Sequence, residues 1–341
     1  MRPPGSASIG LMCNKAHRNL PQRIGNPAEA RSTGFCHFNA AMVVRHSALC
    51  IQRRKFGFTL LELLVVIAMI AILAALLLPV LARSIDQAHK TEEISAGRQL
   101  MLGVQMYSQD FNDAVFIGYA SAQNVGPPVL DNFKLPVQAP ANYRYPWRLV
   151  PYMSGSMALI YSGVNRVFYQ QMQSSDAPDA TDRFNYDYGT SLCPSLGINS
   201  CFIGGDADYA TAAQANAQFG PQTVLSKMNG AIHPSDLMVF MSARGSPSGS
   251  SFAAGTSFSQ VSVEQGWFRV LPPWFQTRQW ASDYSQAATP DEWGQVAPRF
   301  NNHAIAAMLD GHTEEFNLQQ MQDMRHWCNR ATSGNWTLGQ Q

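Results

Sequence analysis

The feature that most constrains this chain is an apolar run of 25 residues, 58–82, near the N-terminus. Its only charged side chain is Glu62, and Arg83 closes it. As a helix rising 1.5 Å per residue, the run would be about 37 Å long, which exceeds the hydrocarbon core of a bilayer, about 30 Å. The run is also too long for the apolar region of a cleaved signal peptide. We therefore expect a transmembrane helix over 58–82.

Charge is distributed unevenly along the chain. Residues 1–57 carry nine Lys/Arg and one acidic residue, whereas residues 58–341 carry 15 Lys/Arg and 22 Asp/Glu. A basic leader ahead of an apolar helix predicts a cytoplasmic N-terminus and a periplasmic or extracellular C-terminal part. The acidic remainder has no basic stripe, so no nucleic-acid partner is expected. Segment 1–41 shows no periodicity and is expected to be disordered or not translated, with Met42 as the alternative start.

Beyond the apolar run the pattern becomes amphipathic. Over 83–111 apolar residues recur at helical spacing with charged residues between them. This predicts one continuous helix from about Thr59 to about Gln109, with Pro79 removing one hydrogen bond inside it. Residues 112–341 are then expected to form a globular extracytoplasmic domain.

Sheet signals in this domain are few and local. Leu237–Met241 reads as a buried strand, and Leu192–Ser195 as the end of another. Ala304–Leu309 and His312–Phe316 flank the dipeptide Asp310-Gly311. Asp-Gly between two such runs predicts a hairpin, with a type I′ turn that needs positive φ at both central positions.

Cysteines and paired carboxylates give weak site signals. Of six cysteines, Cys193, Cys201 and Cys328 follow the apolar run. A Cys193–Cys201 disulfide and free buried thiols are both open, because the odd third cysteine weakens a disulfide framework. Asp206 and Asp208 are weak calcium candidates, since too few oxygen ligands surround them; solvated loop carboxylates are the alternative. We expect no resident metal and no cofactor.

The chain lacks the common sequence motifs of catalytic sites. The sequence contains no phosphate-binding loop, dinucleotide loop or nucleophile elbow, so a non-enzymatic role is expected. The stretch 266–284 is rich in aromatic residues, which either pack in the core or form a sugar- or partner-binding face. Two alternatives therefore stay open: a membrane-anchored extracytoplasmic enzyme or binding protein, and a minor tip adhesin that uses 266–284.

Glu62 is the sharpest single candidate. A carboxylate costs about 2.5–3.5 kcal/mol at mid-bilayer and less near the edge. It can snorkel to the headgroups, or it can await a cation supplied by another chain.

The residues around Glu62 resemble the processing site of type IV prepilins and type II secretion pseudopilins. The likeness rests on a basic leader, a Gly-Phe junction, an acidic fifth residue after that junction, and a proline at position 22 after it: Arg53, Arg54, Lys55, Gly57, Phe58, Glu62 and Pro79. The resemblance implies that a membrane-embedded prepilin peptidase cuts after Gly57 and methylates the new Phe58 amine. Glu62 would then pair with the terminal amine of an adjoining subunit.

Further landmarks are similar to those of a pseudopilin-like group in planctomycete- and verrucomicrobia-type bacteria. They are residues 105–113, 192–195, 233–236 and 299–312, in the order that this group shows. One position departs from the pattern, because Phe300 stands where the group has a histidine.

The resemblance implies an α+β, pilin-like fold: a long N-terminal helix packed on a small antiparallel sheet with long loops. It also implies a single-pass inner-membrane subunit of a type II secretion pseudopilus or a type IV pilus-like filament. Its partners would be prepilin peptidase, other pilin or pseudopilin subunits, the inner-membrane assembly platform and membrane lipid.

Overall fold

The computed structural model describes residues 57, 59–173, 180–245 and 265–339. Every element below lies in the compact unit that starts at Leu60. The basic leader residues Arg53, Arg54 and Lys55, together with Phe58, lie outside the described residues.

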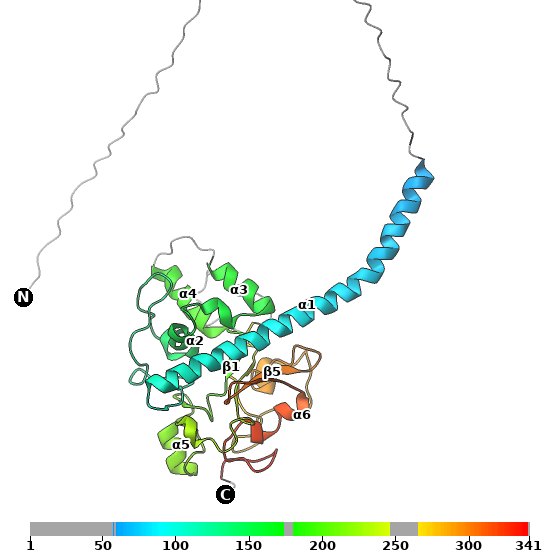
Figure 1. Cartoon of the computed structure of the whole chain (residues 1–341). Helices are drawn as coiled ribbons and strands as arrows, with labels where there is room; N and C mark the ends of the chain where they lie inside the picture. The colour runs from blue at the N-terminus through cyan, green and yellow to red at the C-terminus, as the bar shows by residue number, and fades with distance from the viewer. Residues whose placement is uncertain (1–56, 58, 174–179, 246–264, 340–341) are drawn as a thin grey trace, which may run out of the picture. The chain divides into compact units, whose positions relative to one another are not determined.

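Helix α1 runs without interruption from Leu60 to Asp110, 51 residues (Figure 1). This confirms the expected single helix and its ends to within one residue. The helix stops where Asn112 and Asp113 take positive φ values of 51° and 65°, a conformation that Asn and Asp tolerate better than other non-glycine residues. The Asp113 N–H then donates to the Ser108 carbonyl at 2.7 Å and satisfies one of the last helical acceptors.

The sheet has four antiparallel strands in the order β1-β4-β5-β6. The expected strand at 237–241 is present as β4, shifted by one residue. A separate two-stranded ribbon pairs β2 with β3. The strand bounds are β1 Leu196–Ile198, β2 Gly205–Asp206, β3 Ala210–Thr211, β4 Met238–Ser242, β5 Ala304–Met308 and β6 Thr313–Phe316.

The expected hairpin forms between β5 and β6, but its turn is not type I′. Gly311 takes a positive φ of 98°, whereas Asp310 does not. The Gly311 N–H donates to the Met308 carbonyl at 2.9 Å, and the Met308 N–H donates to the His312 carbonyl at 2.9 Å. This is a three-residue loop that ends on a glycine bulge, the next commonest hairpin connection.

Helices fill much of the segment that the sequence left irregular. Leu192 closes helix α4 and β1 starts at Leu196, so the expected strand end at 192–195 is wrong. The α-helices after α1 are α2 Tyr145–Leu149, α3 Gly163–Gln173, α4 Ala180–Leu192, α5 Ala212–Phe219 and α6 Leu318–Met321. The 3₁₀ helices are η1 Ala141–Tyr143, η2 Val150–Tyr152, η3 Met157–Ile160, η4 Met228–Gly230, η6 Pro290–Trp293 and η7 Met324–His326.

The C-terminal half of α1 lies between two layers. In Figure 1 helices α2, α3 and α4 lie on one side of it, and strands β1 and β5 lie on the other. Gly97 makes the helix-to-sheet contact close: a Cβ there would lie 3.0 Å from the Thr313 Cγ2 and 3.3 Å from the Ala307 Cβ. This half-helix therefore forms the centre of the main core on one face of the sheet. Because a second core covers the other face, β4 and β5 are buried on both faces.

A second core covers the other face of the sheet and includes most of the aromatic residues of 266–284. Phe268 and Trp280 are buried, and the remaining aromatic residues of 266–284 pack partly buried on the core clusters: Trp267, Trp274, Phe275 and Tyr284. Most aromatic side chains of this stretch therefore pack in the protein core and do not form an exposed aromatic surface.

Of the two states left open for the cysteines, the structure shows free buried thiols. Cys193 and Cys201 are free, buried thiols, so the disulfide is not formed. The reason is positional: Cys193 lies in the core around α1 and Cys201 lies in the second core. Burial raises the pKa of both thiols and of Cys328. The architecture is the expected α+β arrangement of a long N-terminal helix with a small antiparallel sheet.

Candidate functional site

The N-terminal half of α1 presents a continuous apolar surface. Its large apolar side chains between Leu60 and Leu81 are each 42–83% exposed. Among the described residues, α1 is the one helix long and apolar enough to cross a membrane. An exposed apolar surface of this size marks a contact with lipid or with other proteins. The helix is therefore suited to a lipid environment over its first half.

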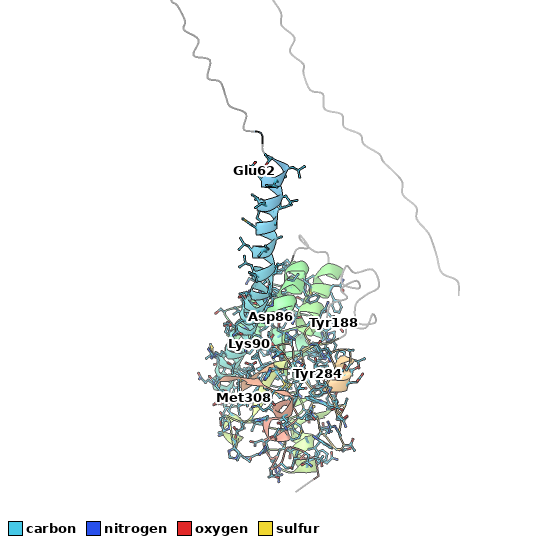
Figure 2. All side chains as sticks on the ribbon, turned by 90° about the vertical axis from the view of Figure 1, so that its right-hand side faces the viewer. Glu62, Asp86, Lys90, Tyr188, Tyr284 and Met308 are labelled. Atoms are coloured by element: carbon cyan, nitrogen blue, oxygen red, sulfur yellow. The ribbon has the colours of Figure 1, made fainter. Side chains whose placement is uncertain are left out.

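Glu62 lies in the first turn of α1, at the exposed end of the apolar half (Figure 2). A carboxylate there interacts favourably with the helix dipole. Pro79 lies within the helix and withholds an N–H from the Ala75 carbonyl, yet the helix continues past it. Gly57 precedes the helix, and a Cβ there would meet nothing within 4 Å.

The other half of α1 carries a second acidic residue, Glu93, in the opposite setting. Glu93 is 1% exposed and lies on the face that contacts the domain. Its carboxylate accepts hydrogen bonds from Ser162 Oγ at 2.9 Å, from Ser242 Oγ, and from Arg299 Nη1 at 2.9 Å. The Ser242 Oγ in turn accepts the Ile305 N–H at 2.8 Å. One buried carboxylate thus joins α1 to the link between η3 and α3, to β4, to β5 and to the segment before β5.

Sequence reasoning did not single out Glu93 or Arg299. A signal was present: Glu93 lies at helical spacing from Gly97, Leu100 and Val104, so it falls on the apolar face of the helix. A carboxylate on such a face needs hydrogen-bond donors.

Weaker polar contacts border this buried centre. Lys90 Nζ lies 2.7 Å from Glu315 Oε2 on β6, and Arg166 Nη1 lies 2.9 Å from Glu92 Oε1. Arg98 Nε donates to Thr313 Oγ1 at 3.2 Å. These partly exposed contacts give orientation more than stability.

The carboxylates proposed for calcium are bound to an arginine. Arg269 Nη1 lies 3.2 Å from Asp206 Oδ2 and 2.8 Å from Asp208 Oδ2, and Ser200 Oγ donates to Asp206 at 2.5 Å. Burial raises the pKa of Asp206, and Arg269 opposes that shift. Within the described ranges no group of three or more His, Cys, Asp or Glu side chains is placed to hold a metal ion.

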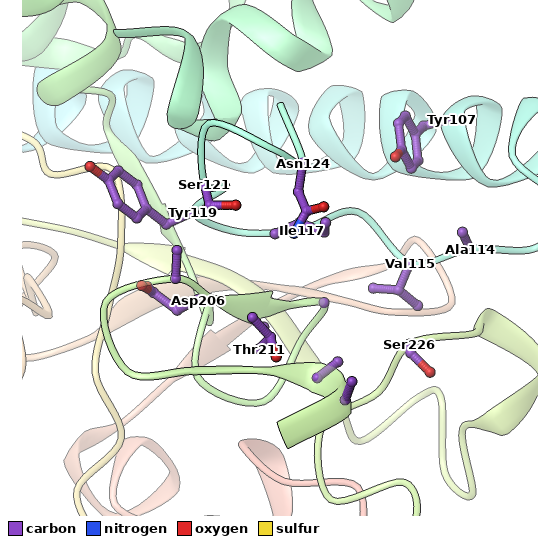
Figure 3. Close-up of a pocket in the computed structure, with 15 residues that line it drawn as sticks. Tyr107, Ala114, Val115, Ile117, Tyr119, Ser121, Asn124, Asp206, Thr211 and Ser226 are labelled. Atoms are coloured by element: carbon purple, nitrogen blue, oxygen red, sulfur yellow. The ribbon is translucent and has the colours of Figure 1, made fainter. Parts of the chain in front are cut away.

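A cavity of about 310 Å³ adjoins Asp206. Figure 3 shows Tyr107 from α1, Tyr119, Asn124 and Thr211 around it. Because the Asp206 carboxylate already accepts hydrogen bonds from Ser200 and Arg269, the cavity offers no unmatched charge for a ligand.

Comparison with protein families matches one motif. The prokaryotic N-terminal methylation motif covers residues 52–78. Neither the curated proteins nor the solved structures include a match to the chain. The matched segment supports a precursor of the type IV prepilin- or pseudopilin-like class; the narrower planctomycete and verrucomicrobia-type group stays a prediction. Motif and helix together are those of a single-pass inner-membrane anchor.

Proposed function

We propose that this chain is a structural subunit and not an enzyme. Prepilin peptidase cuts it after Gly57 and methylates Phe58, and the mature chain assembles through α1 into a type II secretion pseudopilus or a type IV pilus-like filament. The observation that supports this most is that the methylation motif at 52–78 extends into α1. One half of this helix is apolar and exposed, and the other half packs on a folded domain.

A further observation supports the orientation. The charge distribution favours a cytoplasmic leader and an extracytoplasmic domain.

In the assembled form, helices would pack head to tail in a heterologous contact, which generates an open filament. Glu62 would set the axial register by meeting the methylated amine of an adjoining subunit. The assembly platform of the inner membrane, other subunits and lipid are then the partners. The tip-adhesin alternative has less support, because the aromatic stretch 266–284 is largely used in core packing.

Two measurements test the proposal. N-terminal mass spectrometry of the mature protein should find a methylated Phe58; an intact leader, or a cut well after Ala82, would contradict processing. Glu62→Leu should leave membrane insertion intact and reduce recovery in sheared filaments by at least about tenfold, since a register-setting ion pair in a dry interface is worth more than 1.4 kcal/mol. Asp86→Leu, an exposed carboxylate of the same helix beyond the apolar run, is the matched control and should assemble normally.

A further inference from the structure

Two buried carboxylates meet where the loop 128–137 lies on helix α4. Asp131 is 3% exposed and Asp187 is 1% exposed. Asp131 Oδ1 accepts the main-chain N–H groups of Phe133 at 2.8 Å and Leu135 at 2.9 Å, so it shapes the loop. Asp187 is held by its main chain, whose carbonyl accepts the Trp147 indole N–H at 2.9 Å.

The two carboxylates differ in how their side-chain oxygens are partnered. Asp187 Oδ1 is shielded from solvent and has no hydrogen-bond partner among the described residues, whereas Asp131 Oδ2 is paired with Arg183. The charged groups that act on Asp187 are Asp131 from the loop and Arg183 from its own helix. Arg183 Nε lies 2.8 Å from Asp131 Oδ2, so this one cation is committed to Asp131. Two buried carboxylates beside one cation leave an excess negative charge.

A proton on one carboxyl is the simplest way to remove that excess. Burial first, and then the charge of Asp131, raise the pKa of Asp187 to about 7, while Arg183 opposes the shift.

We propose that Asp187 is a proton-operated switch that controls how the loop 128–137 sits on α4. Protonated, Asp187 lets Asp131 and its loop pack against the helix. Ionised, it repels Asp131 and loosens the loop. Arg183 also holds the loop, because its Nη2 donates to the Pro136 carbonyl at 3.1 Å. Two further attachments are Asn132 Nδ2, which lies 2.6 Å from the Tyr186 hydroxyl, and an edge contact between the Phe133 and Tyr186 rings.

The switch would alter a surface that is already unusual. Leu130, Phe133 and Leu135 are 44–49% exposed at the tip of this loop. The loop also borders an open cleft of about 560 Å³, closed on its other side by Val150 and Pro151. Neutral to alkaline pH would therefore change the apolar contact surface that the domain offers to a neighbour.

The sign of the effect follows from proton binding. Between the ordinary aspartate pKa near 4 and about 7, the folded chain holds a proton that the unfolded chain has lost. The free energy of unfolding therefore falls as pH rises through this window and levels off above about 7. Loop protection falls as Asp187 of the folded chain ionises, between about pH 6 and pH 8.

Hydrogen–deuterium exchange on the full chain in detergent micelles tests the switch. Peptides covering 128–137 should exchange about tenfold faster at pH 8 than at pH 6 after correction for intrinsic rates, because the ionised form prevails about ten to one at a pH one unit above the pKa. Asp187→Asn, which stays neutral, should remove this dependence, and the exposed Asp86→Asn should retain it.

Equal pH dependence in Asp187→Asn would overturn the proposal. So would protection at pH 8 that calcium restores and a chelator removes, because the two carboxyls would then hold a cation and not a proton. A carboxyl ¹³C titration of wild-type Asp187 supplies a readout independent of the variant: a midpoint near 7 supports the switch, and a midpoint near 4 overturns it.

Discussion

The two halves of α1 use apolar residues in opposite ways. From Leu60 to Leu81 the apolar side chains surround the helix and are exposed, whereas Leu100, Met101 and Val104 are at most 1% exposed. The first half is apolar on all sides and the second on one face, which is the difference between a helix in lipid and a helix on a protein core. The apolar side chains of the first half are therefore left for contacts with lipid or other proteins, whereas those of the second half contact the domain of the same chain.

Each half also contains one acidic residue in an apolar setting. Glu93 receives its hydrogen bonds from Ser162, Ser242 and Arg299 of the same chain. Glu62 lies in the exposed half, and its proposed partner belongs to another subunit. Similar residues on one helix can thus serve folding in one half and assembly in the other, and this contrast can be tested by substitution.

The largest effect is expected at Glu93. Glu93→Leu leaves Arg299 and two hydroxyls without their acceptor and should lower the free energy of unfolding by about 3–5 kcal/mol. Glu62→Leu should change it by less than about 0.5 kcal/mol, as for a surface substitution. Urea unfolding of the full chain in micelles measures both. Similar losses for the two variants would break the comparison.

A second contrast separates buried from exposed leucines on the docked half. Leu100→Ala creates a cavity in the main core and should cost about 2–5 kcal/mol. Leu102→Ala, two residues away and 58% exposed, should cost less than about 0.5 kcal/mol. Thermal unfolding distinguishes them. A large loss at Leu102 would show that its face is covered by the fold.

Two glycines should respond with opposite signs. Gly97→Ala places a methyl 3.0 Å from Thr313 Cγ2, and this overpacking should cost about 1 kcal/mol or more. Gly103→Ala meets no atom closer than 3.4 Å, so the better helix propensity of alanine should add up to about 1 kcal/mol. Denaturant midpoints of the two variants give the comparison. A gain at Gly97 would mean that helix and sheet can move apart without loss.

The smallest effect is expected at the rim of the docked half. Lys90→Met removes the partly exposed pair with Glu315 and should cost no more than about 1 kcal/mol. A double-mutant cycle with Glu315→Gln isolates the pair, and its coupling should shrink as salt rises. Coupling that is independent of salt would place this pair in the buried network instead.

Local patterns predicted the elements whose information lies within a few residues. The span of α1 followed from the apolar run and the amphipathic repeat, and the hairpin followed from Asp310-Gly311. The turn type did not, because Asp-Gly suits more than one short loop and the strand register selects among them. Helix α4 was missed because its apolar residues are interspersed with polar ones that the fold buries, among them Asp187 and Thr190.

The features of the N-terminal part follow from consecutive residues: the methylation motif at 52–78, the apolar half of α1 and its amphipathic continuation. Other features depend on the folded arrangement: the partners of Glu93, which are 69, 149 and 206 residues away, and the separation of Cys193 and Cys201 into two cores. The reason is physical. Helix periodicity and membrane length are properties of consecutive residues, whereas the satisfaction of a buried charge depends on which distant segments the packed sheet brings to the helix.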